Sequence, residues 1–143
     1  MKSPDGRECS TFLQHRKLAL TGRRTSTLYL LNPQERRVEQ VEVDNCAITQ
    51  GPRCDWLVRL ADMLSQEEIY VELKGSDIHH AVVQLEATID KLSTDRACFL
   101  KRCFVVFTRN PMTGTDVQKY KVRFFRSFRA IFSLVKDKEE VPL

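Results

Sequence analysis

The spacing of apolar residues predicts strands in the first half of the chain. Residues 27–31 and 38–44 are short runs rich in apolar and β-branched side chains, which is typical of strands. Residues 32–35 (Asn-Pro-Gln-Glu) predict a turn, so we expect these two strands to pair as a β-hairpin. Further upstream, a short helix that ends at Gly22 is predicted by the spacing of Phe12, Leu13, His15 and Leu18.

Two more strands and a long helix follow. Residues 54–60 and 69–74 read as strands, and Gly75 ends the second of them. Ser76 or Asp77 can cap the next helix by accepting a hydrogen bond from a first-turn N–H group. One apolar stripe over about four turns is predicted by the helical spacing of Ile78, Ala81, Val82, Leu85, Ile89 and Leu92.

The last third of the chain predicts an inner strand and a second helix. Residues 103–107 are apolar on both faces, which favours a strand inside a sheet. Thr115 and Gln118 fit a capping box, and aromatic residues continue at helical spacing, so we expect a basic, aromatic helix over about 116–136. The element order predicts a mixed central sheet with flanking helices, in the α+β or α/β class.

Length and composition narrow the class of protein. The 143 residues, 42% of them hydrophobic, suit one domain over 1–143. No apolar run is long enough to span a membrane, and the polar start lacks the apolar stretch of a secretory signal, so we expect a cytoplasmic protein. Five cysteines without a CxxC pair argue against a disulfide framework and against a zinc ribbon.

Charge is distributed unevenly along the chain. Residues 53–95 carry 4 Lys+Arg against 9 Asp+Glu, giving −5, whereas residues 96–129 carry 9 against 1, giving +8. An acidic segment beside a basic one suits a metal site next to a surface that binds a polyanion. Taken alone, this charge pattern favours the simpler interpretation of two solvated faces that neutralise each other.

The most informative residues lie in the strands 54–60 and 69–74. Glu72 and Lys74 are two residues apart, so both side chains project from one face of the second strand. A hairpin can bring Asp55 beside Glu72, and these carboxylates with the Leu73 carbonyl would offer oxygen ligands to Mg²⁺. The alternative is a Glu72–Lys74 pair that faces solvent from one wet side of a sheet.

This pattern resembles the PD-(D/E)xK nuclease superfamily, the restriction-endonuclease-like fold. The resemblance rests on Asp55 in Cys-Asp-Trp-Leu-Val, on Glu72-Leu73-Lys74, and on the helix that follows at once and carries Gln84. It covers about residues 27–108. Two departures from the family are Cys54 in place of the usual proline and the lack of an evident acidic helix ahead of the sheet, for which Glu8 is only a faint candidate.

The resemblance implies hydrolysis of phosphodiester bonds with Mg²⁺ or Mn²⁺. Asp55, Glu72 and the Leu73 carbonyl would hold the ion, which would activate a water molecule. Lys74 would orient or activate that water, and Gln84 would hydrogen-bond the water or Lys74. His79 and His80 open the helix near the site, where a solvated first turn is the simpler interpretation.

The implied partner is a nucleic acid, expected to be DNA, although a basic surface does not distinguish DNA from RNA. The residues expected to contact its phosphates are Lys101, Arg102, Lys119, Arg123 and Arg126. Stand-alone members of the superfamily often act as homodimers, which this short chain permits. The rival hypothesis is a non-catalytic adaptor or inhibitor with a nuclease-derived fold, for example in a defence or phage-related system.

Overall fold

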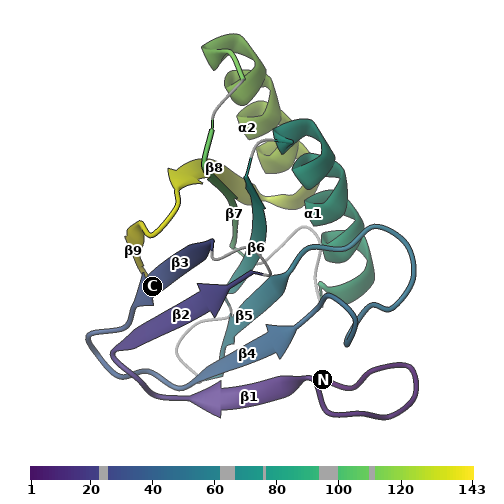
Figure 1. The fold of residues 1–143 in the computed structure, drawn as a ribbon, viewed down its shortest axis with the longest axis vertical. Coiled ribbons are helices and arrows are strands. Elements are labelled where there is room, and N and C mark those ends of the chain that lie inside the picture. The colour runs from purple at the N-terminus through teal and green to yellow at the C-terminus, as the bar shows by residue number, and fades with distance from the viewer. Residues whose placement is uncertain (23–25, 62–66, 76, 94–99, 110–111) are drawn as a thin grey trace.

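The computed structural model of the chain describes residues 1–22, 26–61, 67–75, 77–93, 100–109 and 112–143, without the side chain of Lys74. These residues form two β-sheets and two helices (Figure 1). The larger sheet has the strand order β1 (Ser10–Leu13), β4 (Val38–Glu42), β5 (Trp56–Leu60), β6 (Glu68–Gly75), β7 (Lys101–Phe107) and β8 (Ala130–Lys136). The smaller sheet has the order β2 (Lys17–Thr21), β3 (Thr27–Leu31) and β9 (Glu140–Pro142).

The larger sheet is mixed. Its first four strands, from β1 to β6, pair in antiparallel fashion. The last three strands, β6, β7 and β8, run parallel to one another. Helix α1 (Ile78–Leu92) connects β6 to β7, and helix α2 (Gly114–Phe128) connects β7 to β8. Both helices therefore serve as crossovers between neighbouring parallel strands.

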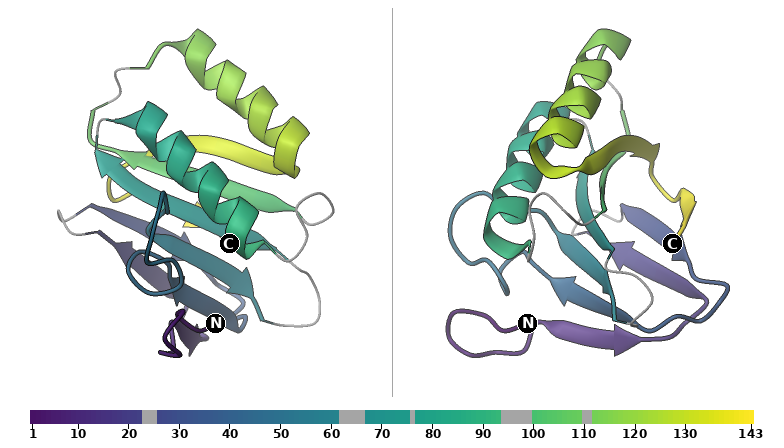
Figure 2. Two further views of the ribbon diagram at one scale, coloured as in Figure 1. Left: turned by 90° about the vertical axis from the view of Figure 1, so that its right-hand side faces the viewer. Right: turned by 180° about the vertical axis from the view of Figure 1, so that it is seen from behind.

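The elements stack in three layers, with the larger sheet in the middle (Figure 2). On one face, sheet residues such as Leu57, Tyr70 and Cys103 form a core with both helices. On the opposite face, Val58 and Val71 form a second core with the three-stranded sheet. Because alternate residues of β5 and β6 enter different cores, the parity of a residue decides whether it faces the helices.

The best predicted elements are the strand at residues 27–31 and the helix at residues 78–92, whose bounds the structure confirms. Asp77 caps α1 by accepting a hydrogen bond from the His80 N–H at 3.1 Å, whereas Ser76 lies outside the described residues. The strand predicted over residues 103–107 lies inside the sheet, between β6 and β8. The mixed sheet with helical cover is thus confirmed, and the class is α+β.

The short helix predicted near the N-terminus is wrong. Strands β1 and β2 stand in its place. In β2, Leu18 and Leu20 are buried while their neighbours Lys17 and Ala19 are exposed, so the pattern has a period of two. The helical spacing of the upstream apolar residues was therefore coincidental.

The hairpin predicted between residues 27–31 and 38–44 is also wrong, because β3 and β4 belong to different sheets. The predicted turn at residues 32–35 does form, with the Glu35 N–H donating to the Asn32 carbonyl at 3.0 Å. The buried Asn32 amide also donates to the carbonyls of His15 and Arg36. These bonds let the loop satisfy its own polar groups while it carries the chain from one layer to the next.

The helix predicted over residues 116–136 ends at Phe128. Arg129 adopts the left-handed conformation, with φ of 56°, and residues 130–136 form β8 along the edge of β7. Alternating burial of Ala130 and Phe132 fits a strand, although the same residues keep helical spacing. The cap also differs from the predicted Thr115, since the Thr113 hydroxyl accepts from the Asp116 N–H.

A disulfide joins Cys9 and Cys46, 37 residues apart, which corrects the expectation that the cysteines form no disulfide. The two residues meet because β1 lies beside β4, where the Glu42 N–H donates to the Cys9 carbonyl at 2.9 Å. Cys54 and Cys103 are free and buried, as small core residues. Neither helix in the described part of the chain is long and apolar enough to cross a bilayer.

Candidate active site

Asp55 directly precedes β5, and Glu72 lies in β6, the strand that pairs with β5. Trp56 pairs with Val71, and the Asp55 N–H donates to the Val71 carbonyl at 3.1 Å, so Asp55 and Trp56 both lie beside Val71 at this end of the ladder. Glu72 has the same parity as Tyr70, which belongs to the helix-side core, and Asp55 lines a cavity with His80 and Gln84 of α1. Both residues therefore lie near the face of the sheet that α1 covers, and their direct juxtaposition as metal ligands stays a prediction.

The two carboxylates differ in exposure. Glu72 is only 3% exposed, whereas Asp55 is half-buried. The Asp55 Oδ2 atom accepts a hydrogen bond from the Leu73 N–H at 2.8 Å, which fixes the orientation of the Asp55 side chain. One carboxylate oxygen of Asp55 thus accepts a hydrogen bond from β6, and the side chain borders two cavities.

Helix α1 is tied to the start of β5 by a buried hydroxyl group. The fully buried Thr88 accepts a hydrogen bond from the Cys54 N–H at 2.8 Å and donates one to the Gln84 carbonyl at 2.8 Å. These bonds set the position of Gln84 relative to residue 55. The Gln84 Oε1 atom is buried and has no hydrogen-bond partner among the described residues.

Asp55 lies between two adjoining cavities. The first, of about 350 Å³, is lined by Asp44, Gly51, Pro52, Arg53, Asp55, His80 and Gln84. The second, of about 220 Å³, is lined by Thr21, Gly22, Glu42, Asp44, Asn45, Asp55 and Trp56. The Asp55 side chain is therefore accessible to a small ligand, and the ligand would meet carboxylate, amide, imidazole and guanidinium groups.

The buried thiol of Cys54 responds to this environment. Burial raises the pKa of Cys54 well above its usual value, and the negative charges of Glu72 and Asp55 raise it further. The hydrogen bond with Thr88 acts in the opposite direction but does not outweigh burial. Cys54 therefore remains a neutral thiol and does not serve as a nucleophile or as a thiolate ligand.

The other predicted site residues have different outcomes. Gln84 does line the cavity that Asp55 borders. Lys74 belongs to β6, but its side chain lies outside the described residues, so its predicted role stays a prediction. His80 lines the same cavity, whereas His79 faces α2 and contacts the Tyr120 hydroxyl through Nδ1.

The five basic residues predicted to contact nucleic acid do not form one surface. The prediction is wrong for Lys101, because its side chain is fully buried and donates to the Phe128 carbonyl at 3.1 Å. Arg102 points to the opposite layer, where it donates to the Pro142 carbonyl of β9. A basic side chain at the start of an apolar strand can be either buried or exposed, and the sequence does not distinguish the two.

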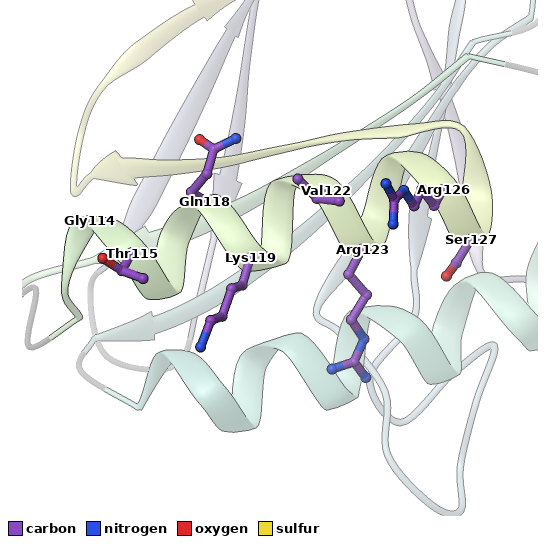
Figure 3. A pocket seen from close by; sticks show the side chains of 8 residues that line it. All are labelled: Gly114, Thr115, Gln118, Lys119, Val122, Arg123, Arg126 and Ser127. Atoms are coloured by element: carbon purple, nitrogen blue, oxygen red, sulfur yellow. The ribbon is translucent and has the colours of Figure 1, made fainter.

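The remaining three basic residues do gather on α2. They line an open groove of about 720 Å³ with Gly114, Thr115, Gln118, Val122 and Ser127. Figure 3 shows Lys119 and Arg123 extending from α2 on the side of α1, while Gln118 extends on the other side. Arg123 also forms an ion pair with Glu86 of α1. Lys119, Arg123 and Arg126 thus form a basic surface, which we call the α2 groove.

Residues near Asp55 that sequence analysis missed come from a loop and from the middle of α1. Arg53 and Asp44 belong to the loop between β4 and β5, and Thr88 lies inside α1. A signal for Thr88 existed, because a threonine on the apolar stripe of a helix needs a partner for its hydroxyl. No comparable signal marked Arg53.

The donors around Asp55 suit a hard divalent cation. Carboxylates, a backbone carbonyl and an amide oxygen are the ligand types that Mg²⁺ and Mn²⁺ prefer. The buried and unpartnered Gln84 Oε1 atom adds a neutral oxygen donor at the same cavity. Within the described ranges, no group of three or more His, Cys, Asp or Glu side chains is arranged to hold a metal, so backbone and amide oxygens would have to complete the set.

No protein-family model matches the chain, and neither a curated protein nor a solved structure is significantly similar to it.

Proposed function

We propose that the protein is a divalent-metal-dependent nuclease that hydrolyses phosphodiester bonds in DNA. The observation that carries this proposal is that Asp55 borders a cavity with His80 and Gln84 of α1, while Glu72 lies on the paired strand β6 close enough for both negative charges to raise the pKa of Cys54. Two carboxylates in this arrangement disfavour each other unless a cation lies between them. A bound divalent ion would supply that charge.

The arrangement of strands supports the resemblance to the restriction-endonuclease-like fold. Strands β4, β5 and β6 form an antiparallel meander that ends in Glu72-Leu73-Lys74, and α1 then leads to the parallel strand β7. This strand order brings Asp55, which precedes β5, and Glu72 of β6 toward one end of the sheet. The same end receives the first turn of α1, which carries His80.

In the proposed reaction, different residues of the chain would hold the metal ion, position its ligands and stabilise charge. Asp55, Glu72, the Leu73 carbonyl and Gln84 Oε1 would hold Mg²⁺ or Mn²⁺. When bound, the ion would lower the pKa of a coordinated water molecule and offset charge on the phosphate oxygens. The Leu73 N–H holds the Asp55 carboxylate in place, and Thr88 holds Gln84 against the start of β5. Lys74 would add positive charge beside the attacking water.

The α2 groove supports a polyanionic substrate. Lys119 and Arg126 are exposed there, and the only acidic residue of α2 is Asp116 in the first turn. Contacts of this type bind the phosphate backbone without reading sequence, so their contribution to affinity falls as salt increases. We expect Lys119→Ala and Arg126→Ala each to reduce the slope of log Kd against log salt by roughly one.

The test is a cleavage assay with plasmid, linear, single-stranded and branched DNA, and with RNA, in Mg²⁺, Mn²⁺ or EDTA. We expect metal-dependent cleavage that Asp55→Asn lowers by at least about a hundredfold, since a ligand would be lost. A matched control is Asp90→Asn, an exposed aspartate of α1. Cleavage of RNA alone would correct the substrate class.

The non-catalytic adaptor is the outcome that would replace this proposal. The lack of a three-residue metal cluster among the described residues gives it some support. An adaptor would cleave none of the substrates, and neither Mg²⁺ nor Mn²⁺ would raise its melting temperature, because no site would bind the ion to the folded state. Cleavage that persists in Asp55→Asn would equally contradict the proposed site.

A further inference from the structure

Arg53 is held rigidly at the cavity that Asp55 borders. Its Nε donates to Asp44 Oδ1 at 2.7 Å, its Nη1 to the Gly51 carbonyl at 3.1 Å, and its Nη2 to Asn45 Oδ1 at 2.9 Å. All three acceptors belong to the loop between β4 and β5. The guanidinium group therefore does not need to be ordered when a ligand arrives, which lowers the entropic cost of binding.

The same guanidinium retains donors for a ligand. An arginine side chain has five N–H bonds, and the three hydrogen bonds found among the described residues leave two of them. The side chain is 24% exposed and lines the cavity of about 350 Å³. Asp44 offsets part of the charge but occupies only the Nε edge of the group.

The opposite wall of this cavity comes from α1. His80 and Gln84 are four residues apart, so their side chains lie one above the other on the same face of the helix. His80 is exposed, and its imidazole is a hydrogen-bond donor at neutral pH. The cavity thus offers a fixed guanidinium, an imidazole and an amide within one small volume beside Asp55.

These groups match the chemistry of a phosphate. A planar guanidinium binds two oxygens of a tetrahedral anion at once, and a second donor from another direction fixes the orientation of the anion. We propose that Arg53 and His80 form a phosphate-binding subsite next to Asp55. This inference rests on the proposed function, since it assigns the groups that would hold the phosphodiester while Asp55 and Glu72 hold the metal.

The phosphate could belong to a nucleic-acid backbone or to a free phosphate ion. NMR spectra of the folded chain in Mg²⁺ can compare dimethyl phosphate, a simple diester, with inorganic phosphate. The chain has three histidines, so His15 and His79 serve as internal controls for His80. We expect either probe to shift the His80 ring and the Arg53 Nε resonances in a saturable manner, and tighter binding of the diester would indicate a backbone subsite.

Variants decide whether these residues carry the binding. Arg53→Gln should weaken binding of the probe at least about tenfold, as expected for losing hydrogen bonds from a charged group. His80→Gln should weaken it several-fold without touching the β4–β5 loop. The matched control is Arg16→Gln, because Arg16 also pairs with a carboxylate, that of Glu35, but lies outside the cavity.

The subsite would be overturned if the His80 resonances stay unchanged, or if Arg53→Gln and His80→Gln bind the probe as tightly as Arg16→Gln. Its failure is distinct from failure of the proposed function. Metal-dependent cleavage with unchanged His80 and Arg53 resonances would remove only the subsite. Phosphate binding that depends on Arg53, with no cleavage of any nucleic acid, would remove only the nuclease.

Discussion

Two glutamates of β6 invite comparison because they share a strand, a face and a degree of burial. Glu68 and Glu72 are four residues apart, both point toward the helices, and they are 4% and 3% exposed. A buried carboxylate costs several kcal/mol unless its charge is compensated. The charged and polar groups around each glutamate therefore indicate whether it has a structural role or is a candidate ligand.

Glu68 lies in a row of alternating charges. The register of four neighbouring strands aligns Glu39, Arg59, Glu68 and Lys101. The Glu68 Oε1 atom also accepts hydrogen bonds from the hydroxyls of Tyr70 and Ser93. At this end of the sheet the chain supplies its own counter-charges, so no ligand is required.

Glu72 lies further along β6, next to Val71, whose carbonyl accepts a hydrogen bond from the Asp55 N–H. Asp55 borders two cavities there, and Arg53 of the β4–β5 loop lines one of them while its Nε donates to Asp44. Two carboxylates near an accessible cavity are therefore the candidate ligands for a cation in the proposed function. The neighbouring groups, more than burial, therefore separate a glutamate with an evident structural role from a candidate ligand.

Removing the cation at the Glu68 end should produce the largest effect on stability. Lys101→Met removes the hydrogen bond to the Phe128 carbonyl and the cation next to Glu68 in register. We expect a loss of about 3–5 kcal/mol in the free energy of unfolding, as for other broken buried pairs. Urea unfolding measures this loss, and Lys119→Met on the exposed face of α2 is the control.

A double variant tests whether Lys101 and Glu68 compensate each other's charge. Lys101→Met combined with Glu68→Gln should cost less than the two single changes added together, because the buried charge left by the first change is removed by the second. Simple additivity would show that Glu68 and Lys101 do not compensate each other.

Removing the disulfide should weaken the end of the sheet that carries Asp55. Cys9 and Cys46 are 37 residues apart, and a loop of that length closed by a disulfide is worth about 3–4 kcal/mol in the chain-entropy account. Urea unfolding with and without a reductant should show this difference for the native chain. The double variant Cys9→Ser, Cys46→Ser should not respond to the reductant.

Thr88 provides a smaller and more local test. Thr88→Val leaves the Cys54 N–H without its acceptor, which should cost about 1–3 kcal/mol of stability. It should also weaken the metal-dependent rise in melting temperature, because Gln84 would no longer be held against the start of β5. Thr88→Ser keeps the hydroxyl and should restore both properties, whereas equal effects of the two changes would assign Thr88 a packing role only.

The elements that could be predicted are those whose signal is local. The stripe of α1 spans four turns, and the strands next to Asp55 and around Glu72 are short apolar runs that pair in antiparallel fashion. The end of α2 was not predictable in this way, because Phe128 and Phe132 keep helical spacing while Arg129 turns the chain into β8. Pairing with the edge of β7 overrides local spacing there.

The parts of the site that could not be predicted depend on contacts between distant segments. The disulfide requires β1 to lie beside β4, and nothing local indicates that pairing. Arg53 becomes part of the cavity only through three acceptors in its own loop, and Lys101 is buried only because Phe128 ends α2 above it. The charge and spacing of residues in the sequence predicted neither the burial of Lys101 nor the place of Arg53 at the cavity.

The measurement that tests the central claim most directly compares Glu72→Gln with Glu68→Gln by thermal unfolding in EDTA and in Mn²⁺. We expect Glu68→Gln to lose about 1–3 kcal/mol of stability, because it weakens the charged row, and to keep the metal-induced rise in melting temperature. Glu72→Gln should lose that rise entirely. If Glu72→Gln still gains stability from Mn²⁺ as the native chain does, or if Glu68→Gln loses the response equally, the assignment of the Asp55–Glu72 end as the metal site is contradicted.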